Sequence, residues 1–143
     1  MKKLIITGLM LAVFGVYAGG NNDAVKFPAG YKSDFTLYHT QNRAGKPQIV
    51  DLYANQTAAA STKAEQLAEG SKIIMEIYKA KQDEAGNPVT LDNGLFEKGK
   101  FAAVAVMEKR SDWGADYPAE LRAGDWGFAL YTPDGQPKEN NLE

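Results

Sequence analysis

The sequence SKIIMEIYKAK, residues 71–81, decides the fold. Its side chains alternate between two faces with a period of two, which predicts a β-strand. One face holds Ile73, Met75 and Ile77, and the other holds Lys72, Ile74, Glu76 and Tyr78. We therefore expect residues 71–81 to form one strand of the sheet.

Glu76 is the unusual residue of this strand. A carboxylate between Ile74 and Tyr78 is costly to bury unless it is paired. We expect a cation from the neighbouring strand, Lys109 or Arg110, to pair with it; a catalytic acid is the alternative.

Four further runs are predicted to be strands. Residues 34–40 and 48–55 alternate and are joined by a Gly-Lys-Pro turn, which indicates a hairpin. Residues 101–110 and 125–132 follow the central strand. The run 101–110 is rich in alanine, so its small side chains face either a bulky bound body or a large neighbour such as Trp113 or Trp126.

One segment is predicted to be the main helix. Residues 56–69 are rich in Ala, Glu, Lys, Gln and Leu, which favour helices. Asn55 is suited to the N-cap and Gly70 to the C-terminal end. The residues expected to face inward are Ala60, Ala64, Leu67 and Ala68.

The order of these elements predicts the fold class. No βαβ alternation occurs, which disfavours a parallel sheet. We expect one α+β domain with a curved antiparallel sheet of about five strands, one main helix and one buried face.

The N-terminus has the features of a signal peptide. Lys2 and Lys3 precede the uncharged apolar run Leu4–Val16, and Val16 and Ala18 supply the small residues that a signal peptidase accepts. We expect cleavage near Ala18, so that residues 1–18 are removed and 19–143 form the domain of a periplasmic or secreted protein. The alternative is an N-terminal membrane anchor.

Composition excludes several functions. The 16 basic and 18 acidic residues are interleaved, so no concentrated basic face for a nucleic acid is expected. The chain has no cysteine, which excludes disulfides, thiolate metal ligands and thioether links within these residues. The one histidine, His39, is interpreted as a half-exposed structural residue, and a hydrolase based on it is the least favoured function.

Five stretches together resemble the cytochrome P-460 family and its β-type cytochrome c-prime relatives. They are FPAGY (27–31), VDLYAN (50–55), EGSKIIMEI (69–77), the small-residue run 101–110 with Trp113, and DWGFALYTPDG (125–135). No single stretch is specific, but their order and spacing are, and they span nearly all of the chain after the signal peptide.

The resemblance implies a c-type haem protein. In the family, a C-terminal Cys-x-x-Cys-His attaches haem c and supplies the proximal histidine, so we expect this segment beyond Glu143 and no metal ligand within the chain. Met75 stands where cytochrome P-460 has a lysine cross-linked to the porphyrin, and Val50 where it has an arginine. These departures favour electron transfer or binding of gases such as nitric oxide over hydroxylamine oxidation.

The haem-pocket residues that the resemblance implies are Val50, Tyr53, Met75, Trp126 and Phe128; their other interpretation is ordinary core. The expected partners are a small-molecule ligand, an electron-transfer partner and a second copy of the chain. The alternative function is a haem-free periplasmic module that binds a small ligand.

Overall fold

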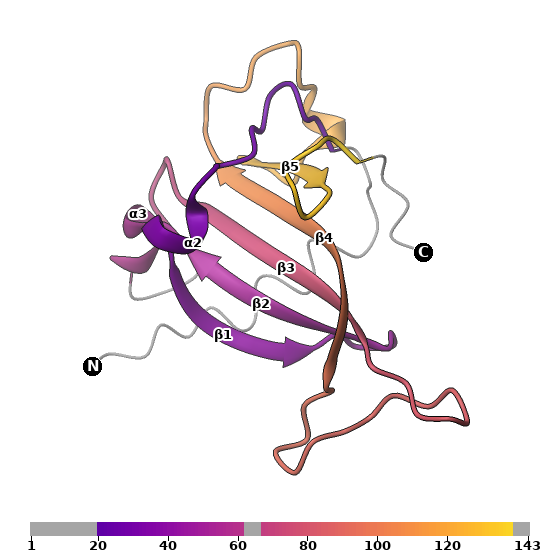
Figure 1. The fold of residues 1–143 in the computed structure, drawn as a ribbon. Coiled ribbons are helices and arrows are strands. Elements are labelled where there is room, and N and C mark those ends of the chain that lie inside the picture. Colours follow the sequence, from indigo (N-terminus) through magenta and orange to yellow (C-terminus); the bar gives the residue numbers. More distant parts are fainter. Residues whose placement is uncertain (1–19, 62–66, 139–143) are drawn as a thin grey trace.

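The computed structural model describes residues 20–61 and 67–138. Five strands form one antiparallel sheet in the order β1-β2-β3-β4-β5, and the sheet does not close into a barrel (Figure 1). The elements are α2 Tyr31–Asp34, β1 Thr36–Asn42, β2 Gln48–Ala54, α3 Gln56–Ala59, β3 Lys72–Ala80, β4 Lys98–Lys109, the 3-10 helix η2 Ala119–Leu121 and β5 Trp126–Tyr131. The five predicted strands and the hairpin of β1 and β2 are confirmed.

The predicted main helix is much shorter than expected. Helix α3 ends at Ala59, and Ser61, Leu67 and Ala68 are not helical, while residues 62–66, including Ala64, lie outside the described residues. The inward-facing alanine is Ala58, whereas Ala60 and Ala68 are exposed.

Asn55 joins the two ends of the segment that connects β2 with β3. Its side-chain oxygen accepts hydrogen bonds from the Ala58 and Lys72 amides, both at 3.0 Å, and its side-chain nitrogen donates to the Gly70 carbonyl at 3.0 Å. The predicted N-cap is therefore correct. The same residue also holds the end of β2 beside the start of β3, a tie that local helix propensity does not reveal.

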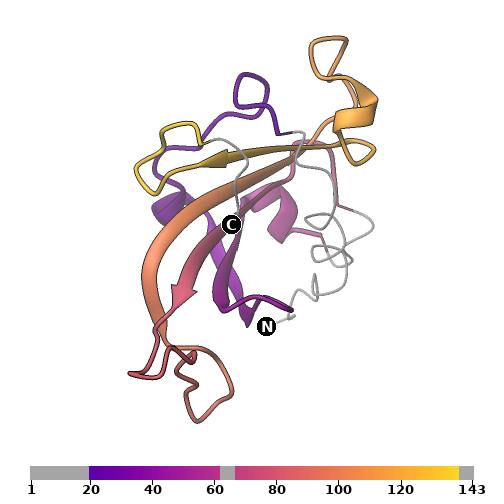
Figure 2. The same ribbon diagram turned by 90° about the vertical axis from the view of Figure 1, so that its right-hand side faces the viewer.

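The sheet is strongly curved, with α3 on its concave side and α2 on its convex side (Figure 2). The expectation of one buried face is wrong, because apolar clusters cover both. The residues between positions 24 and 35 and those of the loop after β4 pack on the convex side, where they bury Val25, Tyr31, Trp113 and Tyr117. Within the described residues no helix is long and apolar enough to cross a membrane.

Candidate functional site

The concave side of the sheet carries a continuous cluster of apolar side chains, most of them buried, which we call the concave face. Its sheet residues are Val50, Leu52, Ala54, Ile73, Met75, Ile77, Ala103, Ala105, Met107 and Leu130, with Tyr38, Trp126 and Phe128 partly buried beside them. Ala58 and Leu67 join the same cluster from the connection between β2 and β3. The face crosses all five strands.

Strand register places Met75 at the centre of the concave face. Met75 lies opposite Leu52 of β2 and Ala105 of β4, and Ala105 in turn lies opposite Leu130 of β5. Residues paired across antiparallel strands share a face, so these four side chains form one row across the sheet. Because the alanine side chain is shorter than that of leucine, the row rises less far from the sheet at Ala105 than at Leu52, on the other side of Met75.

The structure brings together four of the five haem-pocket residues predicted from the sequence. Val50, Met75, Trp126 and Phe128 all belong to the concave face. Tyr53 lies on the convex side, where its ring packs edge-on against Tyr31 with centroids 5.6 Å apart. Tyr53 is therefore separated from the other four by the sheet itself.

The alanine-rich strand β4 faces both sides with different neighbours. Trp113, one of the two proposed large neighbours, packs on the convex side, where a Cβ added at Gly127 would lie 2.7 Å from its ring. Trp126 is partly buried against the concave cluster, to which Ala103 and Ala105 also belong, and it lies opposite Lys109 of β4. These alanines are small and buried, so the side chains of the concave face stand lower beside Met75 than elsewhere along β4.

His39 also lies on the concave side of the sheet. It is paired with Leu52 in the register of β1 and β2, and its Nε2 is 3.1 Å from the side-chain oxygen of Gln41. It is half-buried, at the β1 edge of the sheet. Among the described residues no group of three His, Cys, Asp or Glu side chains could hold a metal ion.

Glu76 is not paired with the neighbouring strand, so the prediction that Lys109 or Arg110 binds it is wrong. Its side chain is fully buried on the convex side, where Tyr31 donates to it at 2.5 Å, Tyr78 donates at 2.8 Å and the Lys32 ammonium lies 3.0 Å away. Two of these three partners are far away in the sequence, in or beside the FPAGY stretch.

The two cations proposed for Glu76 have other partners. Lys109 points to the concave side and donates to the Leu67 carbonyl at 2.7 Å, and Arg110 pairs with Asp112 at 2.9 Å. Side chains of β4 reach Glu76 only from the position opposite it, which is occupied by Val104. Side-chain direction, rather than charge, therefore decided the pairing.

Asp51 lies directly opposite Glu76 in the register of β2 and β3 and is also buried. Like charges in such positions repel each other unless they are compensated. Lys98 pairs with Asp51, and Thr40 donates to it at 2.6 Å. The two acids thus have two lysine partners, so this cluster balances its charge and serves the structure.

Burial raises the pKa of Tyr31 and Tyr78 well above the ordinary tyrosine value, and their hydrogen bonds to Glu76 raise the pKa of each further. Burial also raises the pKa of Tyr38 on the concave side. These phenols stay protonated at neutral pH and act as hydrogen-bond donors. The convex cluster serves the fold, and four of the five residues that the resemblance implies for the haem pocket lie on the concave face, so we take that face as the candidate site.

The chemistry of the concave face fits a porphyrin ring. The ring is flat and apolar, and the face offers aliphatic and aromatic side chains around two alanines. The fit does not extend to covalent attachment, because the 143 residues contain no cysteine for a thioether. His39 is the one imidazole in the sequence.

Sequence reasoning missed several polar residues at one end of the concave face, among them Gln48, Lys79 and Lys100. The signal was present in the repeated Lys-x-Lys pattern at 79–81 and 98–100, at the two ends of the connection between β3 and β4.

Comparison with known proteins agrees with the resemblance. No curated protein sequence matches the chain. The model of the family described as Cytochrome P460, whose members bind haem c, matches residues 28–143, which is most of the chain. The chain therefore belongs to the Cytochrome P460 family.

Proposed function

We propose that the chain is an exported haem-binding domain in which the porphyrin lies against the concave face. The observation that carries the proposal is the continuous apolar surface across the five strands, with Met75 at its centre and Ala105 beside it. Family membership supports haem as the occupant of this surface. The chain has no cysteine, so these residues would hold the ring by contact alone.

The apolar lining favours gas binding or electron transfer over oxidation of hydroxylamine. Haem iron supplies a site for a small diatomic ligand or for one electron, and the polarity of the pocket decides between these uses. Val50, Met75 and Phe128 offer no proton donor and no charge. Tyr38 and Trp126 add only uncharged donors to this face, so its residues would disfavour charged ligands and admit a small neutral ligand such as nitric oxide.

The proposal includes export. Residues 1–18 carry the signal-peptide features, and the family's covalent haem attachment takes place outside the cytoplasm. We accordingly place the protein in the periplasm or in the medium. An electron-transfer partner and a homodimer belong to the same proposal.

The test compares two substitutions of an apolar residue by aspartate. Phe128 is half-buried on the concave face, whereas Leu37 is 49% exposed and lies opposite Tyr53, on the other side of the sheet. Phe128→Asp should weaken haem binding about tenfold or more, because it places a charge against the apolar ring. Leu37→Asp should leave the affinity unchanged. Titration of the purified chain with haemin, followed in the Soret region, measures both.

Equal affinities of the two variants and the unsubstituted chain would contradict binding on the concave face. Uptake of an apolar dye, competed by other apolar compounds but not by haemin, would instead favour the haem-free ligand-binding module.

A further inference from the structure

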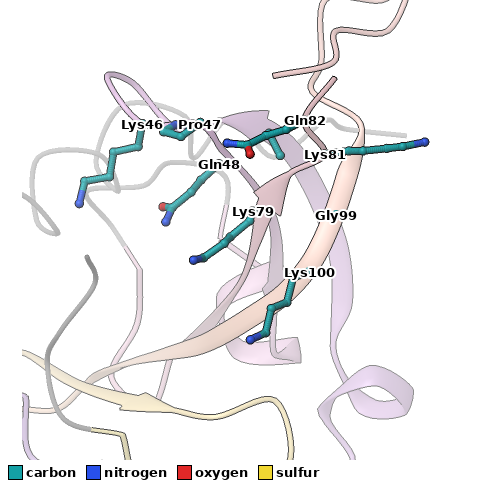
Figure 3. A pocket seen from close by; sticks show the side chains of 9 residues that line it. Lys46, Pro47, Gln48, Lys79, Lys81, Gln82, Gly99 and Lys100 are labelled. Atoms are coloured by element: carbon teal, nitrogen blue, oxygen red, sulfur yellow. The ribbon is translucent and has the colours of Figure 1, made fainter. Parts of the chain in front are cut away.

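Four lysines line an open hollow of about 490 Å³ at one end of the sheet (Figure 3). They are Lys46, Lys79, Lys81 and Lys100, and the polar residues Gln48 and Gln82 accompany them. Among the described residues that line the hollow there is no carboxylate. A concentration of positive charge in a chain with more acidic than basic residues indicates a specific use.

The hollow continues the concave face. Gln48 and Lys79 are paired across β2 and β3, and the next pair on the same side of these strands is Val50 and Ile77, both residues of the concave face. Side chains two positions apart in a strand share a side. The hollow and the apolar surface are thus neighbouring parts of one side of the sheet.

The side chains differ in direction. Lys46, Gln48, Lys79 and Lys100 extend toward the same side, whereas Lys81 points away from them (Figure 3). Lys81 donates to Glu97 at 2.9 Å and is therefore already paired.

Gly99 fixes the position of Lys100 beside Lys79. A Cβ at position 99 would lie 2.9 Å from the Lys79 carbonyl oxygen and 3.2 Å from the Lys81 amide nitrogen, so only glycine allows the two strands to approach so closely. Neither Lys79 nor Lys100 forms an ion pair with any residue in the ranges 20–61 and 67–138. Two adjacent ammonium groups repel each other, and a bound anion relieves that repulsion.

We propose that this hollow receives the propionate carboxylates of the haem that lies on the concave face. The inference rests on the proposed function and deepens it by fixing the orientation of the ring. Haem is apolar except at the edge that carries its two propionates, and the apolar concave face borders the lysines of the hollow where Val50 and Ile77 follow Gln48 and Lys79. Ammonium groups bind carboxylates through charge-assisted hydrogen bonds, and Gln48 adds an amide donor.

An acidic protein surface is the other anion that lysines attract. Lys79 and Lys100 extend toward the same side as Gln48, and register makes this the side of the apolar face, so a ligand lying on that face has these ammonium groups beside it. We therefore favour the carboxylates of the porphyrin.

The experiment compares haemin with its dimethyl ester, in which both propionates are neutral. Both are titrated into the unsubstituted chain, into Lys79→Glu, Lys100→Glu and the double variant, and into the control Lys26→Glu. Lys26 is exposed and follows Val25, which packs on the convex side, so the control makes the same charge change away from the hollow.

The expected result is that each hollow variant binds haemin about tenfold more weakly, the double variant more weakly still, and that the ester binds all forms alike. Lys26→Glu should match the unsubstituted chain. Unchanged haemin affinity in the double variant overturns the inference, as does an equal loss for haemin and its ester. Failure of the unsubstituted chain to bind either porphyrin would instead overturn the proposed function.

Discussion

At position 76 a carboxylate sits in the middle of the central strand with 0% of its surface exposed. Its stability there depends on two phenols and one ammonium group, of which Tyr31 is the most deeply enclosed. The sequence shows that Glu76 needs a partner, but Tyr31 is 45 residues away, and only the folded chain brings the two together.

Removing one phenol should destabilise the fold. Tyr31→Phe deletes the 2.5 Å hydrogen bond to a fully buried carboxylate, so we expect the free energy of unfolding to fall by about 1–3 kcal/mol. Lys32→Ala removes a cation whose side chain is 58% exposed, and should cost less than about 1 kcal/mol. Urea unfolding followed by circular dichroism measures both. A larger loss for Lys32→Ala than for Tyr31→Phe would contradict the account.

The buried phenols also predict sensitivity to alkali. The pKa of Tyr31 and of Tyr78 is raised in the folded state, so the unfolded chain loses these protons first, near the ordinary value of 10.0. Stability is therefore fully present below that pH and falls as the pH rises above it. Each such tyrosine contributes a slope of about 1.4 kcal/mol per pH unit.

Tyr78→Phe removes one of these groups. The free energy of unfolding should then fall less steeply with pH above about pH 10 than in the unsubstituted chain. Unfolding curves recorded at successive pH values measure the slope, and an unchanged slope in Tyr78→Phe would contradict the assigned cause.

Among the elements, the connection from β2 to β3 depends on Asn55. Its side chain bonds to α3, to Gly70 and to the first residue of β3. We expect Asn55→Ala to lower the free energy of unfolding by about 2 kcal/mol, because a helix cap and two loop hydrogen bonds are lost together.

Asn93 provides the matched control. Within residues 20–61 and 67–138 its side chain makes one hydrogen bond, accepted from the Leu95 amide at 3.0 Å in an exposed turn. Asn93→Ala should cost less than about 1 kcal/mol. Equal losses for the two variants in chemical unfolding would show that Asn55 does not tie the two strands together.

Strands were predictable from the sequence and the helix was not, for one physical reason. The alternation of residues 71–81 records burial on both sides of the sheet, which is the outcome of tertiary packing. The composition of residues 56–69 records only intrinsic helix propensity, a weak preference that the tie at Asn55 overrides. The sequence also did not predict that loop residues cover the convex side, because Val25 and Trp113 lie in loops without hydrophobic periodicity.

The candidate site followed the same pattern. Val50, Met75, Trp126 and Phe128 lie on one side of the sheet, as their alternation with residues of the opposite side predicts. Tyr53 does not lie with them, and its position next to Leu52 in β2 already places it on the other side. Lys79 and Lys100 meet through the register of β3 and β4, and Lys46 joins them through the register of β2 and β3, neither of which the sequence specifies.

In the whole molecule, the two sides of one curved sheet have different roles. The convex side stabilises the fold through Glu76, Asp51 and the segments packed on them. The concave side presents an apolar surface with a basic end, suited to a flat ring with acidic groups at one edge.

The most direct test of this division uses methyl signals on the two sides of β3 and β4. Met75 and Met107 lie on the concave side, and Ile74 and Val106 on the convex side. In NMR spectra of the chain titrated with metal-free protoporphyrin, the ring current should shift the methyl signals of both methionines strongly and leave those of Ile74 and Val106 nearly unchanged. Unshifted methionine signals at saturating porphyrin, or larger shifts at Ile74 and Val106, would contradict the account.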